Sequence, residues 1–157
     1  MALAKMETMQ GLALSLQKVS PSALSALPEM ARLTDLVPMD VQDAAFEQVG
    51  RCAELEKLWC MYCRDTSDRA TEKLAGLTRL RYYYAGKTQI TDRSLEVLGQ
   101  IESLEELEFW QIARITNAGL TALARLPRLK KLSLDSAGIT REGLKVFPAG
   151  VEVSYHS

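Results

Sequence analysis

The stretch Ile90-Thr-Asp-Arg-Ser-Leu95-Glu-Val-Leu98 decides the fold, because the chain uses the same pattern again further on. It returns as Ile115-Thr-Asn-Ala-Gly-Leu120-Thr-Ala-Leu123 and as Ile139-Thr-Arg-Glu-Gly-Leu144-Lys-Val-Phe147. Self-similarity at a short, fixed period is typical of proteins that stack one small structural unit many times. The pattern therefore predicts a repeat architecture.

Weaker copies extend the pattern toward the N-terminus and begin at Val19, Val41 and Thr66. The intervals between the first residues of successive copies are 22, 25, 24, 25 and 24 residues. Because this period covers the chain, we expect a single domain over residues 1–157. We expect a partial repeat or cap at 1–18, repeats over 19–147 and a closing strand within 148–157.

The spacing of apolar residues inside each unit changes from three to two. Leu98, Ile101, Leu104 and Leu107 lie three apart, and Phe109 follows two residues later. Spacings of three and four favour a helix and its exit, whereas a spacing of two favours a strand. Each unit is thus predicted to be a helix, a return and a short strand. The expected strand centres are 12–14, 36–38, 58–60, 83–85, 107–109 and 132–134, with a last strand over 151–155.

Polar residues mark where these helices should begin. Thr91, Thr116 and Thr140 stand where a hydroxyl at the N-cap accepts a hydrogen bond from a free backbone amide. Asp92 follows such a position, and its charge favours the positive end of the helix dipole. Pro38 falls at a strand centre, where it has no amide to donate, so we expect an irregular sheet there.

The combined pattern, Leu-x-x-Leu-x-Leu followed by Ile-Thr-Asp-x-x-Leu-x-x-Leu, resembles the leucine-rich repeat family over essentially the whole chain. It is closest to the cysteine-containing type known from F-box substrate adaptors and from similar bacterial repeat proteins. Cys63 stands at that type's characteristic cysteine, while Thr88, Ile112 and Ala137 stand at the equivalent places. The resemblance implies an α/β right-handed solenoid, a horseshoe segment of about six repeats of 22–25 residues. It implies a parallel sheet on the concave face, helices on the convex face, and a binding role without a particular ligand.

Composition narrows the class of partner. The 157 residues are 47% hydrophobic and 25% charged, with a formal net charge of −1. This balance offers no electrostatic reason to expect nucleic acid or an anionic membrane as partner. No apolar run approaches the roughly 20 residues that span a bilayer. Three cysteines without a secretory signal predict a reducing, intracellular location, most simply the cytoplasm.

Alternation along the strands separates core positions from positions on the concave surface. Trp59 and Tyr84 should be direct neighbours on that surface, and Gly86 leaves room for a large ring to lie across it. Exposed aromatic clusters of this kind are typical interface anchors. The predicted partner-binding residues are Trp59, Met61, Tyr82, Tyr84, Trp110, Glu106, Glu108 and Asp135.

These residues predict a non-catalytic protein-protein interaction module, and the acidic ones suggest a partner with some basic character. The alternative is a structural or self-associating repeat segment of a larger multidomain protein, in which a second copy or a flanking segment covers the patch. An enzyme has the least support, because no phosphate loop, nucleophile elbow or metal-ligand cluster appears.

A CxxC pair, Cys60 and Cys63, raises the possibility of a metal or redox site. A structural zinc site needs four ligands, and Cys52 and His156 are the remaining soft candidates. Cys60 and Cys63 also fall on repeat positions that demand small apolar residues. We therefore expect buried structural thiols, with no metal and no cofactor.

Overall fold

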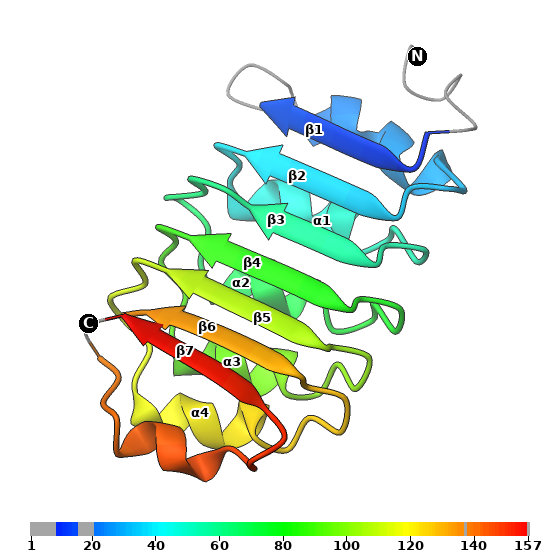
Figure 1. Ribbon diagram of the computed structural model, residues 1–157. Coiled ribbons are helices and arrows are strands. Elements are labelled where there is room, and N and C mark those ends of the chain that lie inside the picture. Colours follow the sequence, from blue (N-terminus) through cyan, green and yellow to red (C-terminus); the bar gives the residue numbers. More distant parts are fainter. Residues whose placement is uncertain (1–8, 16–20, 137, 157) are drawn as a thin grey trace.

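The computed structural model describes residues 9–15, 21–136 and 138–156, and within them seven strands form one parallel sheet in chain order. Figure 1 shows the strands stacked side by side, with helices on one face of the sheet only. We call the other side, which none of the described helices covers, the open face. The strands are β1 (Gly11–Ser15), β2 (Asp35–Met39), β3 (Lys57–Cys60), β4 (Tyr82–Gly86), β5 (Glu106–Trp110), β6 (Lys131–Asp135) and β7 (Glu152–His156).

All seven strands coincide with the predicted centres, because the apolar spacing sets both period and face. Leu58 pairs with Tyr83, Tyr83 with Leu107, and Leu107 with Leu132. These side chains are at most 2% exposed and form one column of the core. At the start of each strand from β2 to β6, one carbonyl of the preceding repeat accepts two amides, as the Glu56 carbonyl does from residues 81 and 82 at 2.8 and 3.0 Å.

The helical segments that return the chain are short. They are η2 (Pro21–Glu29), η3 (Asp43–Ala45), α1 (Phe46–Val49), α2 (Asp68–Glu72), α3 (Asp92–Leu98), α4 (Asn117–Leu123) and η4 (Gly143–Val146), where η marks a 3-10 helix. A period of two dozen residues must also hold a strand and two connections, so little chain is left for a helix. None of the described helices has the length and apolar character needed to cross a membrane.

The helix starts are joined by a ladder of polar contacts between repeats. Thr91 and Thr116 cap α3 and α4 as predicted, by accepting hydrogen bonds from the amides two residues on. The predicted cap at Thr140 differs, because η4 has Glu142 as its N-cap, although the Thr140 hydroxyl still accepts from the amide of Gly143 at 3.3 Å. The hydroxyl residue at this place in each of four repeats is also held by the acidic or amide side chain one repeat earlier. The pairs are Asp43 with Ser67, Asp68 with Thr91, Asp92 with Thr116 and Asn117 with Thr140.

The sheet is irregular at Pro38, as predicted. Strand β2 pairs with β3 only at its first two residues, Asp35 and Leu36, and one further bridge joins Met39 to Met61. Pro38 has no amide for the ladder, and the pairing is interrupted around it. The predicted cap at 1–18 lies largely outside the described residues.

Candidate functional site

The eight predicted partner-binding residues all come from strands β3 to β6 or the residue after β3, and all are half-buried. They alternate with core residues, so that each of β4, β5 and β6 starts half-buried, then buried, then half-buried. Both tryptophans, Trp59 and Trp110, therefore lie on the open face rather than in the core.

The first pair of rings lies near the strand starts. The ring centroids of Trp59 and Tyr82 are 4.7 Å apart and tilted by 44°. The backbone register sets Trp59 directly opposite Tyr84, as predicted, while the indole ring turns diagonally and packs on Tyr82. Burial raises the pKa of Tyr82, and the carboxylate of Glu108 raises this pKa further.

The second pair of rings lies near the strand ends and includes a residue that sequence reasoning missed. Tyr62 meets Trp110 edge to face, with ring centroids 6.2 Å apart. The ammonium nitrogen of Lys87 lies 4.6 Å from the Trp110 centroid and 5.7 Å from the Tyr62 centroid. Tyr62 is 42% exposed, the more exposed of the two large apolar side chains that stand out from the described surface.

Tyr62 and Lys87 reach the open face because the backbone turns at the end of each strand. Asp40, Tyr62, Lys87 and Gln111 have positive φ angles of 55°, 55°, 56° and 51°. They occupy the same place in four consecutive repeats. A left-handed residue breaks the pleat, so strict alternation stops one residue before it. No glycine marks these positions, and the sequence signal is only their place between a strand and the next buried residue.

Gly86 provides the space that the sequence predicts. A Cβ atom built there would lie 2.7 Å from the Tyr84 hydroxyl oxygen and 2.9 Å from a ring carbon, so the ring across Gly86 is that of Tyr84. Burial raises the pKa of Tyr84, and the neighbouring Tyr62 and Glu108 add to the effect.

A hollow of about 430 Å³ opens beside the second pair of rings. It holds four of the predicted residues and adds Tyr62 and His156, which the sequence analysis did not place there. His156 arrives through β7, opposite Asp135. The lining residues are Tyr62, Tyr84, Glu108, Phe109, Trp110, Ser133, Asp135 and His156.

His156, Ser133 and Asp135 all line this hollow, and among the hydrogen bonds described none joins them. A smaller hollow of about 420 Å³ at the first ring pair brings together Trp59, Tyr82 and Glu106 with Lys57 and Arg81. The predicted patch is thus two aromatic hollows on one face.

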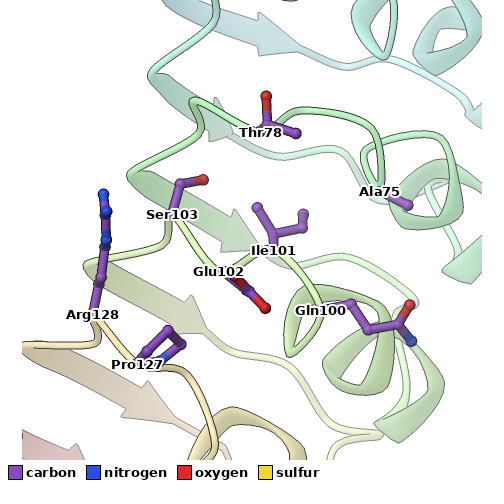
Figure 2. A pocket seen from close by; sticks show the side chains of 8 residues that line it. All are labelled: Ala75, Thr78, Gln100, Ile101, Glu102, Ser103, Pro127 and Arg128. Carbon is purple, nitrogen blue, oxygen red and sulfur yellow. The ribbon is translucent and has the colours of Figure 1, made fainter.

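Another hollow, of about 520 Å³, lies away from the open face. Figure 2 shows that its side chains come from three successive returns and spread across the space without converging. Glu102 and Arg128 are its charged members, and Ser103 donates to the Leu80 carbonyl at 2.7 Å. This arrangement holds no cluster of groups that would act on one ligand.

The thiols are buried and unlinked. Cys52, Cys60 and Cys63 are free cysteines in the core. Burial raises the pKa of Cys60 well above its usual value, while the Cys63 thiol donates to the Pro38 carbonyl at 3.4 Å. The part of the chain that the structure describes gathers no group of three His, Cys, Asp or Glu side chains able to hold a metal ion.

Comparison with known proteins defines the class of fold. No protein-family profile matches the sequence, and no curated protein matches the chain. Among solved structures, internalin C2 from Listeria monocytogenes superposes with a TM-score of 0.59 at 18% identity, over 98% of this chain and 74% of the internalin. A second internalin (inlF) of that bacterium gives a TM-score of 0.38 at 16% identity, over 99% and 63%. The chain has the fold of a leucine-rich-repeat solenoid.

Proposed function

We propose that this chain is a non-catalytic protein-interaction module and that its partner binds the open face. The observation that carries the proposal is the presence of two ring pairs, Trp59 with Tyr82 and Tyr62 with Trp110, on a surface that none of the described helices covers. Rings held half in solvent lose water when a partner docks, and such aromatic anchors dominate binding energies. The polar residues around them supply a rim.

The rings are also held in place before a partner arrives. Trp59 packs on Tyr82, Tyr84 lies across Gly86, and Lys87 covers Trp110. Side chains that are already ordered lose less conformational entropy on binding. A rigid sheet with preorganised rings supports binding better than it supports catalysis, for which no paired acid, base and nucleophile are in place among the described residues.

The test uses the chain as bait and replaces one ring from each pair. Proteins captured by the wild-type chain are identified, purified and titrated by calorimetry against wild type, Trp59→Ala, Trp110→Ala and the control Val146→Ala. Val146 is 39% exposed but lies in η4, away from the open face. We expect each tryptophan change to cost about 2 kcal/mol, a roughly 30-fold loss of affinity, with the control unchanged. Equal affinity for all four proteins, with unchanged circular dichroism, would refute the proposal.

Self-association is the second candidate, and the C-terminal end of the solenoid favours it. Among the described strands β7 pairs with β6 alone, so its other edge is open. Beneath it Leu144, Phe147 and Val153 are only partly buried. Open edges pair readily with other chains. Sedimentation velocity decides: a concentration-dependent dimer that persists in Trp59→Ala and Trp110→Ala supports association through this end.

The cysteines support two further proposals, one for the compartment and one for the repeat subtype. Three buried free thiols suit a reducing compartment, and we propose the cytoplasm. We also propose the cysteine-containing type of repeat. Its support is Cys63, which is fully buried at the expected position and bonded to the preceding repeat through Pro38.

A further inference from the structure

We propose that the hollow beside Tyr62 and Trp110 binds a cationic side chain of the partner, of the arginine type. This inference rests on the proposed function and names the chemistry that the open face recognises. It combines an aromatic corner with carboxylates that form no ion pair with any described residue.

The aromatic corner already holds a cation. Lys87 places its ammonium nitrogen 4.6 Å from the centroid of Trp110 and 5.7 Å from that of Tyr62. Within about 6 Å of a ring centroid a cation is attracted by the ring quadrupole, most strongly by tryptophan. The chain thus shows with its own lysine that this corner accommodates positive charge.

Two carboxylates stand beside that corner. Asp135 is the backbone partner of Trp110, and Glu108 is the backbone partner of Tyr84. Neither of them, nor Glu106, takes part in the ion pairs found among the described residues. Glu105 provides the contrast, because Arg81 and Lys130 bind it at 2.9 and 2.6 Å and lower its pKa to about 2.

A small side chain, that of Ser133, forms the base of the hollow next to the carboxylates. Ser133 pairs with Glu108 on one side and with Ser154 on the other, so no bulky side chain from its position fills the hollow. The basic groups nearby are Lys87 over the rings, Lys131 on the same strand as Ser133, and His156 at the rim. Three carboxylates on β5 and β6 against one lysine leave the open face of these strands acidic.

Among possible ligand groups, a guanidinium matches this surface best. It is planar, stacks on aromatic faces, and forms paired hydrogen bonds with carboxylates. An apolar group would cover Glu108 and Asp135 without pairing them, which is costly. An anion would meet like charge. A partner arginine that stacks on Trp110 takes the place of Lys87, so Lys87 competes for the same corner.

The test uses two peptides that differ only in charge, acetyl-Gly-Gly-Arg-Gly-Gly-amide and the same peptide with neutral citrulline. The chain has two tryptophans, so its two indole N–H signals in an NMR spectrum report on the two ring pairs separately once Trp59→Phe has assigned them. We expect the arginine peptide to shift the Trp110 signal with a Kd of about 1 mM. The shift should then approach saturation at a peptide concentration of roughly 10 mM. The Trp59 signal should move little, and the citrulline peptide should have no saturable effect.

Substitutions in the hollow then identify the contacts. Glu108→Gln and Asp135→Asn should each weaken arginine binding by about two- to five-fold. Lys87→Met should strengthen it by about two-fold or more, because it removes the competing cation. Glu102→Gln, an exposed carboxylate away from the hollow, is the matched control and should change nothing.

The inference is overturned if the arginine and citrulline peptides act alike, if no saturable shift appears, or if Lys87→Met weakens binding. These results leave the proposed function intact when the tryptophan variants still lose their protein partner. Conversely, the proposed function alone would be refuted if the arginine peptide binds as expected but neither Trp59→Ala nor Trp110→Ala weakens the binding of a protein partner.

Discussion

Gly50 lies where one repeat packs closely against the next. A Cβ atom there would press on the backbone carbonyl oxygen of Lys73, and it would lie 2.9 Å from the carbonyl carbon of that residue. The φ angle of Gly50 is −65°, which any residue adopts, so glycine is required for space and not for conformational freedom. Gly76, in the following repeat, has no atom within 4 Å of its Cβ position.

This contrast predicts opposite effects of one substitution at two glycines. Gly50→Ala should lower the free energy of unfolding by roughly 1–3 kcal/mol, because backbone of the next repeat must move. Gly76→Ala should leave it unchanged or raise it by about 0.4–1 kcal/mol, because alanine restricts the unfolded chain. Urea unfolding followed by circular dichroism measures both. Equal effects of the two changes would show that the repeats are not stacked at this distance.

Single residues also show where prediction from sequence stops. Trp59 and Trp110 could be placed on the open face because strand alternation fixes them relative to Leu58 and Phe109. Tyr62 and Lys87 could not, since alternation would point them inward and only the positive φ angle turns them out. The diagonal contact of Trp59 with Tyr82 depends on side-chain torsions, which the sequence does not encode locally.

Among the structural elements, the helix starts are places where side-chain hydrogen bonds link one repeat to the next. The Asp68 carboxylate accepts hydrogen bonds from the amide and hydroxyl of Thr91, both at 2.8 Å, and from the Ser94 hydroxyl at 2.5 Å. Burial opposes ionisation of Asp68, but the hydrogen bonds from Ser94 and Thr91 outweigh it, so its pKa lies below the ordinary 3.8. One carboxylate therefore fastens α2 to the cap of α3.

Removing this carboxylate should loosen two repeats at once. Asp68→Ala is expected to lower the free energy of unfolding by roughly 2 kcal/mol at neutral pH, since it deletes three hydrogen bonds to a charged group. Because the folded-state pKa of Asp68 is lowered, its contribution is complete above the unfolded value and is lost as the pH falls through the folded value.

Urea unfolding at several pH values checks both parts of this prediction. The difference in the free energy of unfolding between wild type and Asp68→Ala should become smaller at acidic pH. Glu96→Ala, an exposed residue of α3, serves as control and should cost little at any pH. A difference that stays constant down to strongly acidic pH would show that the ionised form is not what matters.

The strands could be predicted more fully than the helices. A two-residue spacing of apolar residues, flanked by leucines, predicts a strand, and every strand lies where this spacing predicts it. The helix caps at Thr91 and Thr116 could also be predicted from the sequence. The hydrogen bonds from Asp68 and Asp92 to the next repeat could not be predicted, because they depend on how far successive helices are offset in the stack. The short helical turns and the 3-10 segments likewise follow from the length left between strands.

At the scale of the whole molecule, each repeat contacts mainly its neighbours, so the two faces of the solenoid are nearly independent. The helical face and the polar ladder hold the stack together, while the open face carries the rings and carboxylates that form no ion pair among the described residues. The period alone was enough to predict this division. It could not identify the partner, because partner identity depends on the shape and charge of side chains that the repeat leaves free to vary.

The most direct test of the central claim is hydroxyl-radical footprinting of the chain alone and in complex with its captured partner. Aromatic side chains react readily when exposed, so Trp59, Tyr62 and Trp110 report on the open face, and Phe147 and Tyr155 report on the C-terminal end. We predict that the complex protects the first three and leaves the other two unchanged. Protection confined to Phe147, Tyr155 or the helical face, with both tryptophans as reactive as in the free chain, would contradict the account.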